Sequence, residues 1–399
     1  MSVQGSTFTQ RISNVAKRLD GDASEVWEVH DKACAMADNG EDVLLLSVGD
    51  PDLDTHPDTI NHVIDRLREG RTHYSPSSGE DSLRRIIADV EDRSARRPCS
   101  VDEVLIFPGA TNAIYAVMRT LLNEGDEVIL AEPMYIGYHG IFDSIGAKQV
   151  RIPLNAADNF SLDMEKLKAS VTEKTKVIFI NTPGNPAGNM LSEAELRELA
   201  DFSYRNNIWL VSDEVYSMIT FKERHTSLRK AAEHLDNIIV IDGLSKSHAM
   251  TGWRMGWTVA PESISKHLLN FSASTVFGCC QFVQDAAAYA LQNDSAYMEE
   301  IRGEYQSRRD YVCQRVAAIP KLSCPTPDAG MFVMVDISQV AEDGQDFAHR
   351  LLDAQGVSVL PGIGFGEVTR NFVRISLAQP VEILEPAFDR IEGFINSLL

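Results

Sequence analysis

Apolar and polar residues alternate along the middle of the chain in a pattern that predicts strands followed by helices. Short runs rich in β-branched and aromatic residues indicate buried strands at 127–131, 176–181, 208–213, 238–242 and 256–260. Between these runs, the segments 111–123 and 191–206 repeat apolar residues at helical spacing. Strands that alternate with helices predict a mostly parallel sheet with helices on both faces.

The helix expected at 191–206 has a recognisable start. Ser192 is followed three residues later by Glu195. This is the spacing of a capping box, in which each side chain accepts a hydrogen bond from a backbone N–H group that the helix leaves free. We therefore expect the helix to begin directly after this serine.

The pattern changes after about residue 285. The charged segment 294–319 predicts one long helix. Shorter strand-like runs follow it at 331–337, 357–360 and 372–378. This mixture of one long helix and short strands indicates a smaller α+β unit, with strands that do not alternate regularly with helices.

We accordingly expect two domains and an N-terminal arm. The large α/β domain is expected at 49–285 and the smaller α+β domain at 286–399, joined by a continuous helix. Residues 1–48 contain a predicted helix near 24–38 and no sheet of their own. We therefore expect this arm to pack with the smaller domain.

Composition narrows the classes of partner. The chain has 399 residues, of which 44% are hydrophobic and 24% charged, and its formal net charge is −21, from 58 acidic and 37 basic residues. That charge argues against a nucleic-acid partner and against an anionic membrane surface, because both bind basic patches. An anionic cofactor is still compatible with it, since such a cofactor needs only a local positive pocket.

Cysteine spacing and hydropathy predict a location. The six cysteines form neither a CxxC pair nor a metal-ligand pattern, so we expect buried thiols and no metal site. Residues 1–13 lack the apolar core of a signal peptide, and no apolar run is long enough to span a bilayer. These features predict a cytoplasmic protein that does not span a membrane.

Candidate chemistry gathers at the carboxyl ends of the predicted strands, which is the edge where open α/β sheets bind ligands. Lys246 follows the strand at 238–242, and Arg254 comes eight residues later. A lysine that bonds to an aldehyde and an arginine that binds a phosphate are groups that pyridoxal phosphate requires. Alone, a lysine in this position is more often an ordinary solvated side chain.

Three other strand ends supply further groups of this kind. Residues 107–111 (FPGAT) lead into a helix whose first free N–H groups attract a phosphate. Asn185 can donate to a phenolate oxygen, and Pro186 after it is a candidate for a cis bond. Asp213 can keep a pyridine nitrogen protonated, and Tyr216 can bond the ring oxygen. Each motif alone has a structural explanation, as a helix cap or a turn, but none of these predicts their joint order.

In this order of motifs the chain resembles the class I and II aminotransferases, which are pyridoxal-phosphate enzymes of fold type I, nearly from end to end. The resemblance implies a large domain with a mostly parallel mixed sheet flanked by helices, plus a smaller α+β domain. It implies that Lys246 bonds to the cofactor and moves protons. It also implies that Asp213 pairs with the ring nitrogen and that Asn185 and Tyr216 contact the ring hydroxyl.

The same resemblance implies the remaining contacts. Tyr135, in AEPMY, would stack on the ring, and Pro133 before it is a second candidate for a cis bond. Tyr74 would reach the phosphate of the neighbouring subunit, which implies a homodimer with shared active sites. Within one subunit the phosphate would be held by Gly109, Ala110, Thr111, Ser245 and Arg254.

The resemblance also implies how substrates bind. Gly49, Asn185 and Arg374 would recognise the α-carboxylate, and arginine suits this because its planar fork meets a carboxylate with two hydrogen bonds. Trp27 and the segment 274–280 would line the side-chain pocket, the latter from the partner subunit. His248 departs from the aromatic residue that many relatives carry there; it either packs beside Lys246 or tunes its proton transfers.

The motifs AEPMY, SDEVYS and LSKSHAMTGWR resemble those of arginine–pyruvate transaminases in particular. This implies ping-pong transfer of an amino group from a basic L-amino acid to a 2-oxo acid such as pyruvate, as part of amino acid metabolism. Aromatic and aliphatic donors remain alternatives. An acidic donor ranks lower, because no second arginine is evident for its side-chain carboxylate.

Two other classes of function share these motifs. A pyridoxal-phosphate β-lyase that breaks C–S bonds has the same fold and cofactor residues, and differs in what leaves the substrate. A DNA-binding regulator built on an aminotransferase domain ranks low, because the net charge is strongly negative and only about 45 residues precede the motif LSVGDPD. The run GIGFG at 362–366 is expected to be a turn, since no helix follows it.

Overall fold

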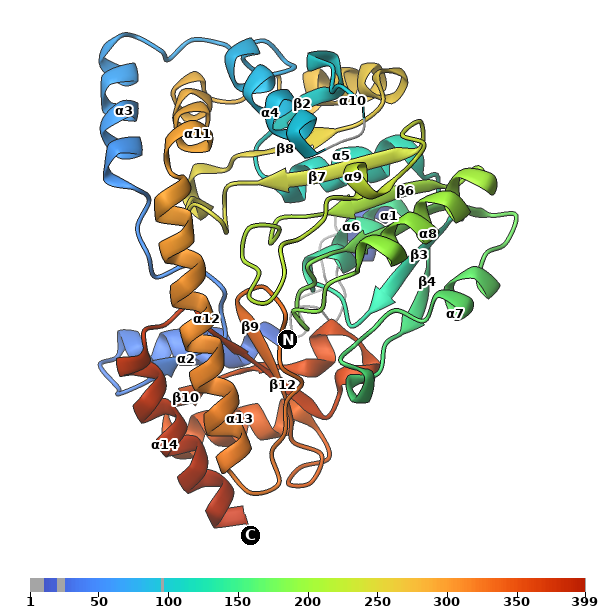
Figure 1. Cartoon of the computed structure of the whole chain (residues 1–399). Helices are drawn as coiled ribbons and strands as arrows, with labels where there is room; N and C mark the ends of the chain where they lie inside the picture. Colours follow the sequence, from blue (N-terminus) through green and yellow to red (C-terminus); the bar gives the residue numbers. More distant parts are fainter. Residues whose placement is uncertain (1–10, 20–25, 95–96, 399) are drawn as a thin grey trace.

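The computed structural model describes residues 11–19, 26–94 and 97–398. In this part of the chain the strands form one sheet of seven strands, one of three and one of two. The seven-stranded sheet and its helices make up the upper part of Figure 1, and the smaller sheets lie below it. The helix α12 (Ser295–Ala318) runs between the two parts.

The seven-stranded sheet is mostly parallel, as the sequence predicts. Its spatial order is β2 (Val104–Phe107), β8 (Gly256–Val259), β7 (Ile238–Gly243), β6 (Trp209–Asp213), β5 (Thr175–Asn181), β3 (Glu127–Glu132) and β4 (Lys148–Pro153). The strands from β7 to β4 pair in parallel. Only β8 runs against its two neighbours. Because the parallel strands share one direction, their carboxyl ends meet at one edge of the sheet.

Successive residues of the central strands face opposite sides of this sheet. In β5, Val177 and Phe179 join the apolar cluster of α5 (Ala110–Leu121), α6 (Gly137–Ile145) and α10 (Glu262–Thr275). Ile178 and Ile180 join the cluster of α7 (Met164–Ala169), α8 (Glu193–Arg205) and α9 (Leu228–Ala231) on the other side. A strand buried on both faces needs a continuous apolar run, which explains why these strands are readable in the sequence.

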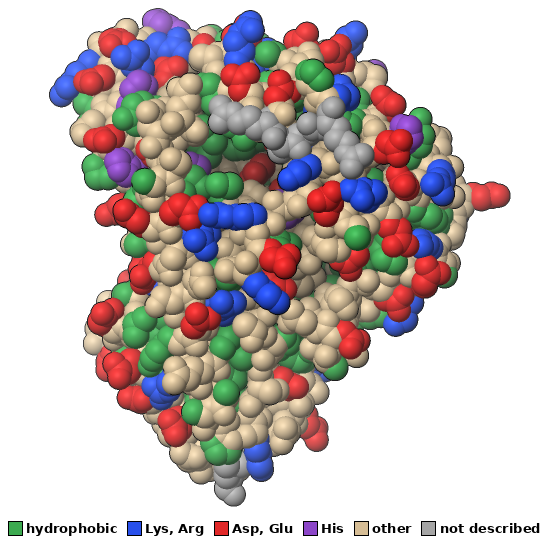
Figure 2. All heavy atoms as spheres, in the orientation of Figure 1, with side chains coloured by type: hydrophobic (Ala, Val, Ile, Leu, Met, Phe, Trp, Pro, Cys, Tyr) green, Lys and Arg blue, Asp and Glu red, His purple; other side chains and the backbone are tan. Residues whose placement is uncertain are grey.

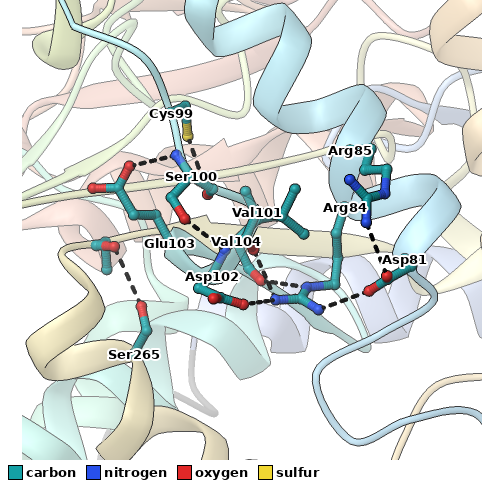
Figure 3. Close-up of polar contacts among 11 residues, drawn as sticks. Asp81, Arg84, Arg85, Cys99, Ser100, Val101, Asp102, Glu103, Val104 and Ser265 are labelled. Carbon is teal, nitrogen blue, oxygen red and sulfur yellow. Dashed lines mark hydrogen bonds and ion pairs between the residues drawn. The ribbon is translucent and has the colours of Figure 1, made fainter.

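The edge of the sheet at β2 is covered by α3 (Pro57–Arg68), α4 (Asp81–Ser94) and α11 (Gln281–Asn293). Figure 3 shows how Arg84 fastens α4 to the start of β2. It donates to the carbonyl oxygens of Val104 (2.9 Å) and Val101 (2.7 Å), and it pairs with Asp81 and Asp102. The guanidinium of Arg84 is buried, and each of its hydrogen bonds is strengthened by its positive charge. These bonds hold the edge strand β2 against α4.

The smaller part of the molecule is built on short strands. Its three-stranded sheet is antiparallel and consists of β11 (Leu360–Pro361), β12 (Phe372–Ser376) and β9 (Phe332–Asp336). The strand β1 (Leu44–Leu45) pairs in parallel with β10 (Val357–Ser358). One apolar cluster joins β1, β9, β10 and β12 to α2 (Glu28–Asp38), α12, α13 (Gly344–Gln355) and α14 (Val381–Leu398).

The structure departs from the predicted elements in several places, and the strands β1 and β2 were not predicted. The strand β4 is not among the predicted strands, because it is an edge strand in which polar residues are mixed with apolar ones. The run 357–360 divides into β10 and the start of β11, in different sheets. In the N-terminal arm, α1 (Asn14–Leu19) packs against α6 of the large sheet, and only α2 packs with the smaller part as expected.

Two predictions are not decided by these elements. The domain boundaries at 48/49 and 285/286 stay predictions, and part of the helix expected near 24–38 falls at residues 20–25, which lie outside the described part of the chain. Among the described helices, none combines the length and the apolar character needed to cross a bilayer. On the face drawn in Figure 2, acidic and basic side chains are mixed rather than gathered into one basic surface.

Candidate active site

A cavity of about 380 Å³ lies where β5, β6 and β7 end, and it extends to the strands of the three-stranded sheet. Residues from positions 27 to 374 meet here, so the cavity brings together segments that are far apart in the sequence. Most of the residues expected to bind cofactor or substrate line it: Trp27, Gly49, Ala110, Thr111, Tyr135, Asn185, Asp213, Tyr216, Ser245, Lys246, Arg254 and Arg374.

One end of the cavity suits an anion. The helix α5 begins at Ala110, directly after Gly109, whose φ is +89°. A Cβ atom at position 109 would lie 2.5 Å from Arg254 Nη2, so glycine is what allows the guanidinium to lie against the start of the helix. The guanidinium adds its charge to the free N–H groups of the first helical turn, and an anion binds favourably at such a place.

Asp213, which also lines the cavity, is buried at the end of β6. Its Oδ2 accepts a hydrogen bond of 2.6 Å from the hydroxyl of Tyr138, and its Oδ1 accepts one of 3.2 Å from the N–H of Val215. Burial raises the pKa of this carboxyl to about 6, and the two hydrogen bonds oppose that rise because they favour the charged form. Asp213 can therefore hold a positively charged ring nitrogen near neutral pH.

Asn185, Tyr216 and Arg374 form one hydrogen-bonded group. Asn185 Nδ2 donates to the Tyr216 hydroxyl over 3.4 Å, and Arg374 Nη1 donates to Asn185 Oδ1 over 3.0 Å. Arg374 Nη2 donates to the carbonyl oxygen of Ser47 over 2.9 Å. The arrangement holds the guanidinium in a fixed plane, which is what two-point recognition of a carboxylate requires.

The guanidinium of Arg374 is enclosed by aromatic rings. Its central carbon lies 3.8 Å from the ring centre of Phe332 and 4.8 Å from that of Phe365. Burial lowers its pKa to about 10, which still leaves the group charged at neutral pH. Phe332 also explains Gly49, because a Cβ atom at position 49 would collide with this ring. Neither phenylalanine was singled out from the sequence.

Lys246 lies between these groups on the loop after β7. Its Nζ donates to the carbonyl oxygen of Gly49 over 2.7 Å. Burial lowers the pKa of the amine to about 8, and while Asp50 works against this change, Arg374 and Arg254 add to it. An amine with a pKa near 8 is neutral in about a tenth of the molecules at pH 7, far more than an ordinary lysine, so it can act as a nucleophile and as a base.

The two proline bonds that the sequence marks as candidates are both cis. These are Asn185–Pro186 and Glu132–Pro133. A third cis bond, Thr182–Pro183, was not anticipated.

Several expected residues lie outside the cavity. Tyr74 is 84% exposed, and its ring packs edge-on against Phe277, within the segment 274–280. His248 is buried, with its Nδ1 2.8 Å from the Ser247 hydroxyl, and burial lowers its pKa to about 4. The run GIGFG forms a short 3₁₀ helix at Gly362–Phe365 before β12, close to the expected turn.

Four polar residues that line the cavity were not singled out from the sequence: Asp50, Tyr138, Asn181 and Thr251. Tyr138 bonds Asp213 from 75 positions away, and no local pattern predicts such a contact. Asp50 follows Gly49 directly and lines the cavity. Its only signal in the sequence is its place beside a residue expected to bind a carboxylate.

The residues present fit pyridoxal phosphate. The positive end at α5 matches a phosphate, Asp213 matches a ring nitrogen, Asn185 and Tyr216 match a ring hydroxyl, and the Lys246 amine matches an aldehyde. The close approach of Arg254 to Gly109 is a specific structural feature, since any other residue at 109 would fill the space that the guanidinium occupies. This donor set covers each polar group of the cofactor.

Comparison with known proteins gives a consistent result. The profile of the family "aminotransferase class I and II" matches residues 41–391. The arginine–pyruvate transaminase AruH of Pseudomonas aeruginosa is 40% identical over 381 residues, which cover 96% of this chain and 97% of that protein. The aspartate aminotransferase of Bacillus subtilis is 31% identical over 390 residues, covering 96% of this chain and 99% of the relative.

Solved structures share the fold. A mutant of the Thermus thermophilus aspartate aminotransferase superposes with a TM-score of 0.91 at 28% sequence identity, covering 96% of this chain and 99% of the other. The structural likeness therefore extends over nearly the whole chain, including the large sheet and the smaller ones.

Proposed function

We infer the reaction from one premise: the chain belongs to the aminotransferase class I and II family. The family match spans residues 41–391, and relatives with transaminase activity match nearly the whole chain. The protein is therefore a transaminase, an enzyme that moves an amino group between an amino acid and a 2-oxo acid. What remains to be proposed is its cofactor site, its substrates and its assembly.

We propose that the chain binds pyridoxal phosphate, the cofactor of its family, in the cavity at the ends of β5, β6 and β7. When bound, this cofactor supplies an aldehyde that takes up the amino group and a ring that draws electrons from the α-carbon. Arg254 and the first turn of α5, with Ala110, Thr111 and Ser245, bind its phosphate. Tyr135 covers a face of its ring.

Asp213 keeps the ring nitrogen protonated, and the burial of this carboxylate strengthens the charged hydrogen bond. Asn185 and Tyr216 hold the ring hydroxyl in place. Lys246 would hold the aldehyde of the cofactor, and its amine would take the proton from the α-carbon of the donor. Its lowered pKa supports this role, because a neutral amine is required to accept a proton.

Arg374, Asn185 and Gly49 bind the α-carboxylate of the substrate in this proposal. Asn185 and the Phe332 ring fix the guanidinium, so little side-chain freedom is lost when the substrate binds. The same contacts orient the α-carbon toward Lys246, whose Nζ lies 2.7 Å from the Gly49 carbonyl oxygen. The loop that contains Gly49 therefore contacts both the expected carboxylate site and the lysine that accepts the proton.

For the donor, we propose arginine or another basic L-amino acid, with a 2-oxo acid such as pyruvate as acceptor. The observation that carries this choice is the 40% identity to an arginine–pyruvate transaminase over 96% of the chain. An acidic donor is less compatible with the cavity. Among the described residues that line it, the cations are Lys246, Arg254 and Arg374, and each already has a role.

We also propose a homodimer in which Tyr74 completes the phosphate site of the neighbouring subunit. The exposure of Tyr74 together with Phe277, two aromatic rings in contact on the surface, supports this, because a partner surface would cover them.

The lysine assignment can be tested chemically. Replacing Lys246→Ala should lower the transamination rate by about 10²–10⁴-fold, because the general base is removed. Borohydride reduction should fix pyridoxal phosphate to the peptide that contains Lys246, as detected by mass spectrometry. The control is Lys222→Ala, which removes an exposed lysine and should leave both results unchanged. Transamination by Lys246→Ala at the wild-type rate would refute the assignment.

The substrate proposal needs a panel of donors with pyruvate and 2-oxoglutarate as acceptors. Arginine, lysine or ornithine should give the highest kcat/KM, ahead of leucine, phenylalanine and aspartate. Failure of all three basic amino acids, with turnover of neutral ones, would discard the basic donor. Release of pyruvate and ammonia from a cysteine-type substrate without any acceptor would indicate a β-lyase instead.

A further inference from the structure

Two carboxylates line the active-site cavity among the described residues, Asp213 and Asp50. Asp213 is buried, and both of its oxygens already accept hydrogen bonds, from Tyr138 and from the Val215 N–H. Asp50 differs because it is exposed to solvent while it lines the cavity. It is therefore the carboxylate of the cavity that an incoming substrate can meet.

The surroundings of Asp50 leave it available for a cation. Its Oδ1 accepts a hydrogen bond of 2.7 Å from the Thr251 hydroxyl, which orients the carboxylate. In the described part of the chain, no lysine or arginine forms an ion pair with it, and its Oδ2 has no hydrogen-bond donor. A carboxylate held by one neutral donor keeps its charge and an oxygen for a further partner.

Asp50 also lies in the loop that lines the cavity beside the expected carboxylate site. It is the residue after Gly49, so the two Cα atoms are about 3.8 Å apart. The carbonyl oxygen of Gly49 contacts Lys246, and the ring of Phe332 lies between Gly49 and Arg374. A substrate whose α-carboxylate lies on Arg374 therefore has this loop beside its α-carbon.

We propose that Asp50 binds the cationic end of the donor's side chain and thereby selects basic amino acids. The proposal rests on the function proposed above and deepens it by naming a specificity-determining residue. A guanidinium or ammonium group donates a charge-assisted hydrogen bond to the free oxygen of Asp50. A side-chain carboxylate is repelled by the same group, so one residue both attracts basic donors and discourages acidic ones.

The wall of the cavity accommodates the rest of such a side chain. Trp27 and Val48 line it alongside Asp50, and they offer apolar surface for the methylene groups of a long basic side chain. Asp50 also raises the pKa of Lys246 through its charge. Removing that charge should therefore affect all donors to some extent, and a test must separate this common effect from selectivity.

The test compares Asp50→Asn with wild type on L-arginine and L-citrulline. Citrulline has nearly the shape of arginine without its charge, and asparagine keeps the shape of aspartate. We expect the ratio of kcat/KM for arginine to that for citrulline to fall by about tenfold to a hundredfold in the variant. Any change in Lys246 cancels in this ratio. The matched control is Asp54→Asn, an exposed aspartate outside the cavity, which should leave the ratio unchanged.

A binding measurement provides a readout that does not depend on turnover. The compound 5-guanidinopentanoate keeps the carboxylate and guanidinium of arginine but has no amino group to transfer. Calorimetry on the holoenzyme should show that wild type prefers it to pentanoate and that Asp50→Asn loses most of this preference.

The outcomes separate the two proposals. A wild-type enzyme that prefers arginine, with an unchanged ratio in Asp50→Asn, overturns the role of Asp50 and leaves the donor proposal intact. A wild-type enzyme that uses neutral donors and rejects every basic one overturns the proposed donor, and the role of Asp50 falls with it.

Discussion

Asp213 owes its properties to two opposing influences within a few ångströms. Burial favours the neutral carboxyl and raises its pKa, whereas the hydroxyl of Tyr138, 2.6 Å away, favours the carboxylate and lowers it. Tyr138 is itself fully buried, and its pKa is raised well above the usual value by burial and by the neighbouring Asp213 charge. The tyrosine therefore keeps its hydroxyl proton and donates a hydrogen bond to Asp213. It acts as a positioning residue for the Asp213 carboxylate.

Replacing Tyr138→Phe should therefore move the pH profile. The ring stays, with its edge contacts to Phe179 and Tyr135, but the hydrogen bond to Asp213 is lost. Without that bond the pKa of Asp213 rises, so the carboxylate becomes protonated at a higher pH as the solution is acidified. We expect the acid limb of kcat/KM to shift upward by about one pH unit. The measurement is kcat/KM against pH for one donor.

The control for this experiment is Tyr204→Phe, which removes an exposed hydroxyl from a ring stacked on His234. Its acid limb should coincide with that of wild type. An unchanged acid limb in Tyr138→Phe would mean that the hydroxyl does not support the charge of Asp213.

At this scale the sequence reveals residues whose role follows from a local motif. Lys246, Asp213 and Asn185 each stand at the end of a recognisable apolar strand, and the structure gathers them in one cavity. Tyr138 and Asp50 were missed because their importance comes from contacts across the fold. Neither residue type nor spacing distinguishes a tyrosine that bonds a distant aspartate from one that packs in a core.

Hydrophobic patterning identifies most of the strands that are buried on both faces. The five strands predicted for the large sheet correspond to β3, β5, β6, β7 and β8. The strand β2 was missed although its four residues are all buried, because so short an apolar run cannot be assigned by periodicity alone. The strand β4 has a largely polar or half-exposed surface, and its position depends on pairing with β3. Pairing partners are not encoded in local periodicity, so an edge strand of this kind is not readable until the sheet is assembled.

The start of α8 is an element-scale feature that is confirmed and can be measured. The Ser192 hydroxyl accepts a hydrogen bond from the Glu195 N–H, and Glu195 Oε2 accepts one of 2.8 Å from the Ser192 N–H. Replacing Ser192→Ala removes the first of these caps. We expect a loss of about 1 kcal/mol in unfolding free energy, observed as a lower urea midpoint with an unchanged slope.

The matched control for Ser192→Ala is Ser307→Ala, which changes an exposed serine in the interior of α12. Alanine is the better helix former there, so the urea midpoint should stay or rise slightly. A Ser192→Ala protein as stable as wild type would show that Glu195 alone suffices to satisfy the first turn.

At the scale of the whole molecule, the proposed dimer has one consequence for activity. If Tyr74 completes the site of the neighbouring subunit, no subunit holds a full set of phosphate contacts of its own. Tyr74 and Phe277 then lie at the subunit interface, which accounts for an 84% exposed tyrosine beside a half-exposed phenylalanine in a single chain. The sequence alone implies a shared active site only through family resemblance. The exposure of Tyr74 becomes visible only in the folded chain.

Mixed dimers test directly whether Tyr74 completes the site of the neighbouring subunit. One subunit carries Lys246→Ala and the other Tyr74→Ala, and each homodimer should be strongly impaired. In the mixed dimer, the intact lysine of the second subunit meets the intact tyrosine of the first. One complete site is restored, so mixing after reversible dissociation should regain activity, measured as transamination per dimer.

Activity returns only if Tyr74 belongs to the site of the other subunit. The control therefore combines two variants whose residues both belong to the site of their own subunit. Lys246 and Asp213 line one cavity within a single chain. A mixed dimer of Lys246→Ala with Asp213→Ala therefore has one defect in each site and should remain inactive. If the pair containing Tyr74→Ala also stays inactive although mixed dimers form, then Tyr74 serves its own subunit or none. Recovery in that pair alone would establish that each active site is shared between two chains.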